Sequence, residues 1–285
     1  MEAPGRESHG VVRDAVIALG FVWGHPSNRG KRVRVAARAI GFQVRGRLLG
    51  KPTRVPCGER SVLELLPSFG ASGLVYANPL EAPEIAVWRA TLRSGDLFID
   101  VGAHVGSYTV WASELGAHVI AIEPDPGAVA VLRRNVEING FDTEILEAAV
   151  SDRAGEARFT VGGGVLNHLV PGGDAGRVVR TITLDDVIGD RVVAGVKIDV
   201  EGAEGLALRG ARKALGERRI RLLQLEWNPQ ASVNFGTERS EIAELLETSG
   251  YELCRPDASG KLIPIEHHAP GPDVFARLRS AEEPR

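Results

Sequence analysis

Short apolar runs alternate with longer mixed segments through the middle of the chain. Five runs have the length of buried strands, at residues 97–101, 118–122, 144–150, 196–200 and 221–226. Strands that are buried on both faces of a parallel sheet are near-continuous apolar runs, and their alternation with helical segments is typical of βαβ units. The pattern predicts an α/β fold with a doubly wound, mainly parallel sheet.

One helix in this series has well-marked ends. Asp125 is a good N-cap, Pro126 follows at the first helical position, and the pair Asn139 and Gly140 is a suitable C-terminal stop. We therefore expect a helix from Pro126 to about Asn139, packed between two strands of the sheet.

Two further apolar segments, residues 157–161 and 178–183, predict a hairpin. The connection between them, residues 162–176, is rich in glycine and contains His168. Mobile loops beside a rigid scaffold often carry substrate contacts, so His168 is a candidate catalytic residue. The alternative is a surface hairpin without a role.

A glycine-bearing turn follows the run 97–101. Gly102 and Gly106 flank this turn, where missing side chains let a ligand approach the backbone. The next apolar run ends in Glu123, whose carboxylate can accept hydrogen bonds from both hydroxyls of a ribose. The G-x-G-x-x-G order of a dinucleotide site is absent, because His104 stands between the two glycines, and this favours S-adenosylmethionine over NAD. An ordinary tight turn is the alternative.

Charged residues interrupt the run 196–200. Lys197, Asp199 and Glu201 follow one another at spacing two, which in a strand directs all three toward one side of the sheet. Charges on a buried strand are expected only at its carboxyl end, where open α/β sheets bind their ligands. The alternative is an ion pair of Lys197 with Asp199 or Glu201 that merely closes the sheet edge.

Five ordered segments together resemble the FkbM family of S-adenosylmethionine-dependent methyltransferases. These segments are residues 98–109, 121–124, 148–155, 183–186 and 196–204. The resemblance covers roughly residues 81–278 and does not extend to residues 1–80. One position departs from the pattern, since the family usually has Asn where this chain has His104.

The resemblance implies a class I methyltransferase fold, with a seven-stranded sheet and helices on both faces, that binds S-adenosylmethionine. It also implies roles for residues at the carboxyl ends of the strands. Asp100, Gly102 and Ala103 would line the methionine end of the cofactor, and His104 and Gly106 of the same turn are also implied to bind it. Glu123 would hold the ribose, Pro124 and Val150 would sandwich the adenine, and Ser151 and Asp152 would lie near the adenine edge. Asp199 would face both the amino group of the cofactor and the substrate cavity.

Length and composition fit one large domain with an N-terminal addition. The chain has 285 residues, of which 44% are hydrophobic and 25% charged. We expect residues 1–80 to form a cap that shapes the acceptor pocket and residues 81–285 to form the methyltransferase domain. A net charge of −3 argues against a nucleic-acid or anionic-membrane partner. The two cysteines, Cys57 and Cys254, support neither a disulfide framework nor a zinc site, and the chain is expected to be cytoplasmic.

The N-terminal region has an unusual distribution of charge. Residues 29–54 hold nine basic residues and no acidic one. The plain interpretation is a solvated face whose arginines balance acids elsewhere. The alternative is recognition of an anionic substrate group by Arg32, Arg34 or Arg38. Short helices are expected at residues 11–23 and 33–40, followed by strands or a cap between residues 46 and 83.

The predicted reaction is O-methylation of a small hydroxylated molecule, and it needs a group that removes the hydroxyl proton. The candidates for this base are His168, Asp199, Glu201 and Glu226. A Mg²⁺ ion held by the three carboxylates would also acidify an acceptor hydroxyl, although no dedicated metal motif is present. The alternatives are an N-methyltransferase of a small amine and a non-catalytic nucleoside-binding module.

Overall fold

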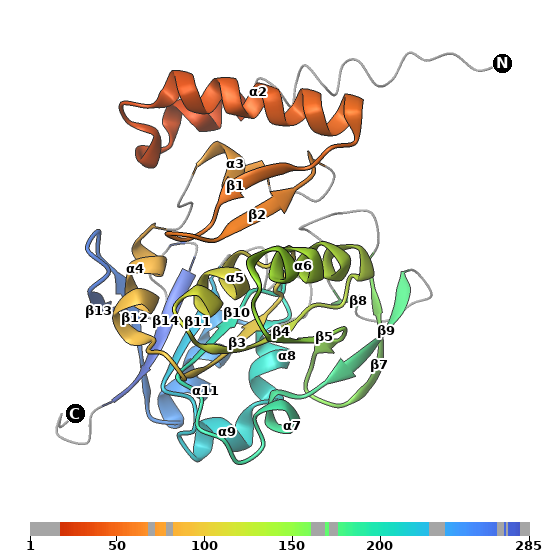
Figure 1. Ribbon diagram of the computed structural model, residues 1–285. Coiled ribbons are helices and arrows are strands. Elements are labelled where there is room, and N and C mark those ends of the chain that lie inside the picture. The colour runs from red at the N-terminus through yellow and green to blue at the C-terminus, as the bar shows by residue number, and fades with distance from the viewer. Residues whose placement is uncertain are drawn as a thin grey trace.

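The computed structural model describes residues 18–67, 72–77, 82–160, 169–170, 176–227, 237–266, 271 and 273–279. Within these residues the largest sheet has eight strands in the order β13-β12-β14-β11-β10-β3-β4-β5 (Figure 1). In chain order they are β3 (Leu97–Val101), β4 (His118–Ile122), β5 (Thr143–Leu146), β10 (Gly195–Ile198), β11 (Leu222–Glu226), β12 (Tyr251–Pro256), β13 (Leu262–Pro264) and β14 (Asp273–Leu278).

The middle of this sheet is parallel and one side of it is antiparallel. Strands β11, β10, β3, β4 and β5 pair in parallel, whereas β14, β12 and β13 add antiparallel pairs beyond β11. The predicted fold class is therefore confirmed. The described sheet has one strand more than the seven expected, because the short strand β13 pairs with β12 at the edge.

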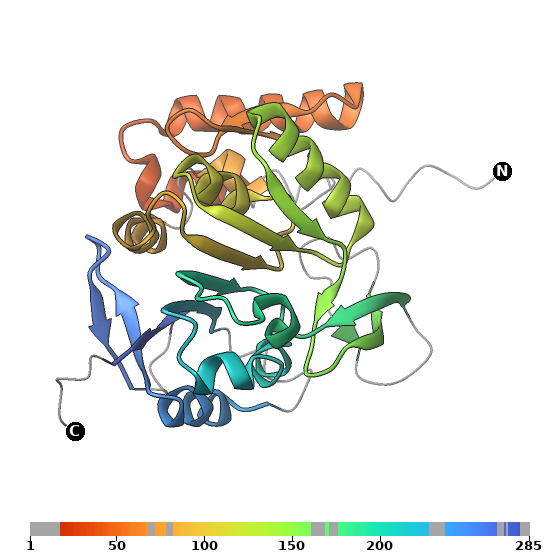
Figure 2. The same ribbon diagram turned by 60° about the horizontal axis from the view of Figure 1, so that its bottom comes forward.

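Helices cover both faces of the sheet, as a doubly wound fold requires (Figures 1 and 2). One face carries α4 (Ala82–Thr91), α5 (Ser107–Glu114) and α6 (Pro126–Asn139). The other carries α7 (Leu184–Ile188), α8 (Glu204–Arg209), α9 (Arg212–Gly216) and α11 (Arg239–Thr248). Among the described helices, none combines the length and the apolar composition needed to cross a membrane.

Helix α6 has the ends that its sequence predicts. The Asp125 carboxylate accepts hydrogen bonds from the backbone N–H groups of Gly127 and Ala128, at 2.8 and 3.0 Å. Gly140 ends the helix in the left-handed conformation, with φ of 69°. Local sequence signals are sufficient here because both caps involve residues only a few positions apart.

One predicted strand is divided between two sheets. We expected a single strand at residues 144–150, but β5 ends at Leu146 and β6 (Ala149–Val150) pairs with β9 (Arg177–Ile182) in a separate small sheet. A turn in which the Ala148 N–H donates to the Leu146 carbonyl, at 3.1 Å, redirects the chain. The predicted hairpin is confirmed, because β7 (Gly155–Phe159) pairs with β9 in antiparallel fashion. The two-residue strand β8 (Leu169–Val170) completes this sheet.

The described N-terminal region begins with a helical segment at residues 18–24, which includes the described part of the helix expected at 11–23. A short 3-10 helix, a long helix, a two-stranded sheet and a short helix follow. These are η1 (Pro26–Asn28), α2 (Arg32–Leu49), β1 (Thr53–Pro56), β2 (Val62–Leu65) and α3 (Ser72–Tyr76). Helix α2 is much longer than the expected segment 33–40. Gly46 lies inside it without ending it, and a Cβ there would lie 2.2 Å from the Pro67 ring, so this glycine allows close packing of the helix against Pro67.

The N-terminal region is attached to the outer side of α5 and α6 (Figure 1). Asn135 of α6 accepts a hydrogen bond from the Glu64 N–H at 2.7 Å and donates to the Val105 carbonyl at 2.8 Å. The Glu114 carboxylate at the end of α5 accepts from the Ser61 N–H at 2.8 Å. These bonds join β2 to the helix layer on one face of the large sheet. Whether this region also shapes an acceptor pocket stays a prediction.

Candidate active site

The turn after β3 is held in place by close packing as well as by its backbone freedom. Gly102 has φ of 77°, and a Cβ on it would lie 1.8 Å from the Asp199 carbonyl oxygen. Gly106 has φ of 91°, and a Cβ there would lie 2.5 Å from Leu132 of α6. Both glycines are therefore required by the protein's own packing. The turn after β3 and the carboxyl end of β10 lie in direct contact.

The departure from the family pattern at His104 is explained by the backbone. His104 has φ of 49°, in the left-handed region that non-glycine residues seldom adopt. Asn and His are both enriched there compared with other side chains, so either residue satisfies the turn. The His104 N–H then donates to the Glu123 carboxylate at 2.9 Å.

Glu123, directly after β4, is a buried carboxyl group with two backbone donors. Glu123 is only 6% exposed. One oxygen accepts from the His104 N–H and the other from the Asp125 N–H, at 2.9 and 2.8 Å. Burial raises the pKa of Glu123 to about 7, although these two hydrogen bonds oppose the shift. A carboxylate offers about four lone-pair sites, so each oxygen can accept one further donor.

Asp100 of β3 is a second buried carboxyl group. One oxygen accepts from the Thr109 hydroxyl at 2.6 Å, whereas the other is buried without a hydrogen-bond donor among the described residues. Burial raises its pKa, and the neighbouring Lys197 and the Thr109 hydrogen bond oppose this effect. An orphaned buried acceptor costs free energy, so a ligand that donated a hydrogen bond to this oxygen would relieve that cost.

Lys197 and Asp199 form the ion pair that the sequence offered as an alternative. The Lys197 ammonium lies 2.8 Å from the Asp199 carboxylate and 4.7 Å from the centre of the Tyr108 ring. Lys197 is 5% exposed, whereas the Asp199 side chain is 41% exposed. The pair therefore does not bury Asp199, which remains accessible at the edge of the sheet.

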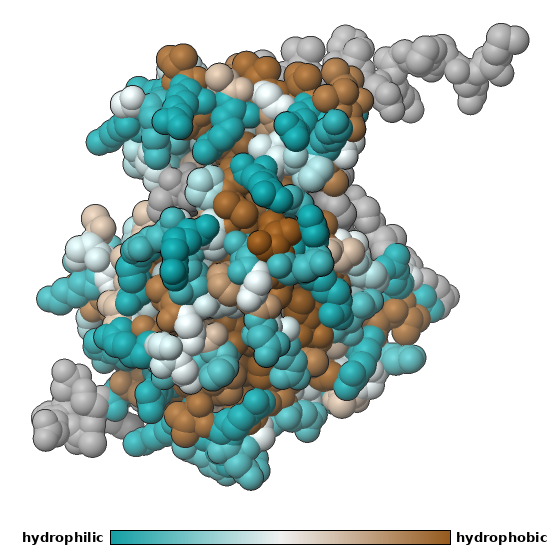
Figure 3. All heavy atoms as spheres, in the orientation of Figure 1, coloured by the Kyte–Doolittle hydropathy of each residue, from teal (hydrophilic) through white to brown (hydrophobic). Residues whose placement is uncertain are grey.

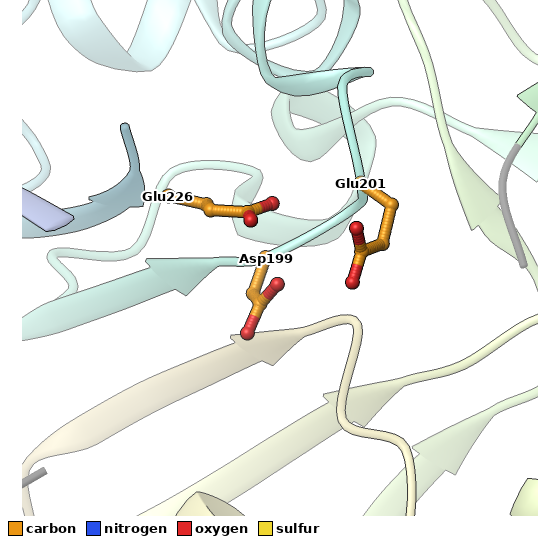
Figure 4. Close-up of side chains that lie close together, drawn as sticks. All are labelled: Asp199, Glu201 and Glu226. Atoms are coloured by element: carbon orange, nitrogen blue, oxygen red, sulfur yellow. The ribbon is translucent and has the colours of Figure 1, made fainter. Parts of the chain in front are cut away.

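Three carboxyl groups meet beyond the ends of β10 and β11. One oxygen each from Asp199, Glu201 and Glu226 lies within 4.8 Å of the others, and the three groups could together hold a metal ion (Figure 4). The expectation that Glu201 continues the strand is wrong, because β10 ends at Ile198. Glu201 lies in a turn with φ of 52°, and this turn brings its side chain to the other two.

Glu226 is a carboxyl group whose surroundings oppose its ionisation. Its pKa is raised to about 8, first by burial and then by repulsion from Asp199, Glu201, Glu204 and Asp273. One Glu226 oxygen is buried without a hydrogen-bond partner among the described residues. The raised pKa therefore brings the gain and loss of a proton by this group into the range where a general base works.

Sequence reasoning missed several residues beside this cluster. Glu204 is buried, accepts from the Val200 and Gly202 N–H groups at 3.1 and 3.2 Å, and has a pKa raised to about 7 by burial. It stabilises the turn that carries Glu201. The only sequence signal was a carboxylate shortly after a glycine turn. A small pocket beside Glu226 is lined by Gly202, Glu204, Glu226, Trp227, Thr237, Arg239 and Ile242.

The remaining predicted residues are placed as follows. Ala103 and Val150 are buried, Pro124 follows Glu123, and the Ser151 N–H donates to the Ile182 carbonyl at 2.9 Å. Asp152 lies 3.5 Å from the Arg153 guanidinium. His168 and most of residues 162–176 lie outside the described residues, so their predicted role stays a prediction.

Comparisons with known proteins agree with the resemblance in the sequence. Residues 100–253 match the model of the methyltransferase FkbM domain. The chain is 30% identical over 161 residues to the 31-O-demethyl-FK506 methyltransferase FkbM of Streptomyces tacrolimicus, covering 43% of this chain and 62% of that protein. It is 31% identical over 108 residues to the ribosomal protein L11 methyltransferase of Thermotoga neapolitana, covering 36% of this chain and 39% of that protein.

The chain thus spans less than two thirds of either of these relatives. Among solved structures, the tRNA (uracil-54, C5)-methyltransferase of Pyrococcus abyssi aligns with a TM-score of 0.46 and 17% identity, over 80% of this chain and 44% of that one. The family match covers more than half of the chain and includes Asp100, Glu123, Asp199 and Glu226. The chain therefore belongs to the FkbM methyltransferase domain family, as the sequence predicted.

Proposed function

We propose that this chain transfers the methyl group of S-adenosylmethionine to a hydroxyl oxygen of a small molecule. The observation that carries the proposal is the direct contact between the turn after β3 and the end of β10, where Gly102 meets the Asp199 carbonyl. A cofactor bound on that turn would then lie next to an acceptor bound beside the carboxyl groups. Methyl transfer by in-line displacement requires the two molecules to be neighbours.

The residues around the turn fit S-adenosylmethionine. Asp100 has a buried oxygen without a donor, which suits an ammonium group, and Glu123 has lone pairs left for ribose hydroxyls. Gly102, Ala103, His104 and Gly106 would line the methionine end. Pro124, Val150, Ser151 and Asp152 would surround the adenine. The bound cofactor supplies a methyl group already activated by its sulfonium.

Glu226 is the carboxyl group best suited to remove the acceptor proton. A general base works best when its pKa is close to the working pH, and the pKa of Glu226 is raised to about 8. Asp199 is held by Lys197 at 2.8 Å and would orient the acceptor. Glu201 would assist from the turn. His168 on the glycine-rich loop remains the alternative base.

A divalent cation such as Mg²⁺ is compatible with the same three carboxyl groups. Their spacing within 4.8 Å and their mutual repulsion favour an added positive charge. Asp199, Glu201 and Glu226 would hold the ion, which would lower the pKa of an acceptor hydroxyl. In that case none of the three needs to act as the base.

The acceptor class is supported by the name of one relative. The Streptomyces protein is named for a 31-O-demethyl substrate, and this name describes an oxygen that lacks its methyl group. The other relative is named for a ribosomal protein, so transfer to another acceptor is the rival proposal. The N-terminal region and residues 162–176 would shape the acceptor pocket, because caps and loops vary around a common scaffold.

A mass-shift screen tests this function. Purified protein would be incubated with S-adenosylmethionine and a panel of hydroxylated and amine-bearing small molecules, and products would be analysed by mass spectrometry. We expect a hydroxylated acceptor to gain one methylene mass in a reaction that needs S-adenosylmethionine, with the methyl group on oxygen by NMR. Methylation on nitrogen alone would contradict the acceptor class. Tight cofactor binding without turnover of any acceptor, with and without Mg²⁺, would favour a binding module.

A further inference from the structure

Helix α2 has apolar residues on two opposite faces. Val35, Ala36, Ala39 and Phe42 are buried against the rest of the N-terminal region. At 3.6 residues per turn, a second set falls on the opposite side within an arc of about 80°. This outward stripe consists of Val33, Ile40, Val44 and Leu48, all of them exposed.

The stripe is exposed along its length. Val33 and Leu48, at its two ends, are 76% and 77% exposed. Figure 3 shows apolar residues along the outer edge of the molecule over α2. Exposed apolar residues gathered on one helix face mark an interaction site.

Positive charge flanks the stripe. Residues 29–54 hold nine basic and no acidic residues, whereas the whole chain carries a net charge of −3. By helical position, Arg34 and Arg45 lie on one side of the stripe and Arg47 lies on the other. The expectation of no membrane partner rested on the net charge, which averages away this local concentration.

We propose that α2 lies on the surface of a bilayer that contains anionic lipids. The stripe enters the boundary between head groups and acyl chains, and the flanking arginines contact lipid phosphates. A second copy of the chain is a poorer partner, because pairing two stripes would bring two sets of like charges together. Nucleic acid would attract the arginines but would give the apolar stripe no partner.

Vesicle cosedimentation of the full chain tests this proposal. The vesicles are phosphatidylcholine alone, or phosphatidylcholine with roughly one third phosphatidylglycerol. We expect binding to the anionic vesicles that is at least about tenfold stronger than to the neutral ones and that weakens with added salt. The double variants Ile40→Ser/Val44→Ser and Arg34→Ser/Arg45→Ser should each weaken it about tenfold. The matched control Val192→Ser changes an exposed apolar residue outside α2 and should bind like the unaltered chain.

All four altered positions on α2 are exposed, and circular dichroism and melting temperature will show whether the variants fold. Absence of binding to anionic vesicles would overturn the proposal, and so would binding that the Ile40→Ser/Val44→Ser variant leaves unchanged. A dimer in solution that the same variant dissociates would assign the stripe to a second copy instead. Binding to RNA that needs the arginines but not the stripe would also contradict it.

Discussion

Two carboxyl groups at the same edge of the sheet, the buried Glu123 after β4 and the half-buried Glu226 at the end of β11, show how differently one fold can treat an acid. Burial is the first cause of the raised pKa in both, to about 7 for Glu123 and about 8 for Glu226. Around Glu123 two backbone N–H groups oppose the shift, and the carboxyl groups of Asp125 and Asp100 make smaller contributions that add to it. Around Glu226 the neighbours are other carboxyl groups, and they increase it.

The difference separates a preformed binding group from a reactive one. The donors to Glu123 come from the turn after β3 and from Asp125, so its carboxylate has a fixed orientation before any ligand arrives. The cluster of Glu226 with Asp199 and Glu201 has an unfavourable concentration of negative charge. A proton, a cation or a ligand donor would relieve it. We therefore expect the Glu123 side to serve binding and the Glu226 side to serve chemistry.

The largest expected effect is on turnover at the Glu226 side. Glu226→Gln keeps the shape of the side chain but removes its ability to accept the acceptor proton. We expect turnover at saturating cofactor to fall about 10²-fold or more, as is usual for loss of a general base. Calorimetry should show cofactor affinity within about threefold of the unaltered chain. Glu137→Gln, on the exposed side of α6, is the matched control.

Full activity in Glu226→Gln would remove this residue from the mechanism and leave His168 as the candidate base. If a chelator abolishes activity and Mg²⁺ restores it, Glu226 becomes a metal ligand with Asp199 and Glu201.

The second effect is on cofactor affinity at the Glu123 side. Glu123→Ala removes the acceptor for the ribose hydroxyls and should weaken S-adenosylmethionine binding by about 1.5–3 kcal/mol, with turnover at saturation much less affected. The ribose hydroxyls would donate to the ionised form of Glu123. The affinity of the unaltered chain for S-adenosylmethionine should therefore rise with pH through about 7. One pH unit below that value it should be about tenfold weaker than its limiting value at high pH.

Isothermal titration calorimetry across this pH range measures both effects. Glu123→Gln cannot ionise and should show weak binding with little pH dependence near 7. An affinity that follows pH equally in the variant and in the unaltered chain would mean that another group binds the ribose.

The smallest effect is on stability. The pKa of Glu226 is raised in the fold above its ordinary value of 4.5, so the folded chain holds this proton more tightly than the unfolded chain. Its contribution to stability is fully present below pH 4.5 and is lost as the pH rises through about 8. Glu226→Gln should therefore melt at least about 2 °C above the unaltered chain at pH 9, with a smaller difference at pH 5.

Thermal unfolding by circular dichroism at the two pH values tests this prediction. Added Mg²⁺ should raise the melting temperature of the unaltered chain more than that of Glu226→Gln if the cluster holds the ion. If Glu226→Gln is less stable than the unaltered chain at pH 9, the fold stabilises the ionised form of Glu226, and the prediction is wrong.

Local sequence signals were enough for the ends of α6, for most of the parallel strands and for the family. The ends of α6 depend on Asp125, Pro126 and Gly140, and the capping hydrogen bonds there join residues no more than about one helical turn apart. Continuous apolar runs specified the parallel strands, and the spacing of Gly102, Gly106 and Glu123 indicated the family. These features are short-range consequences of backbone conformation and hydrogen bonding, so they can be read without knowing the fold.

Only the tertiary structure decided which strands and side chains from distant parts of the chain come into contact. It divided residues 144–150 between two sheets, because β6 pairs with β9 some thirty residues later. It brought Glu201 to Asp199 and Glu226 through a left-handed turn that no strand pattern predicts. The pKa values of Glu123 and Glu226 likewise depend on burial and on charges from several elements. Burial and electrostatic repulsion act through space, and the sequence order alone does not contain those distances.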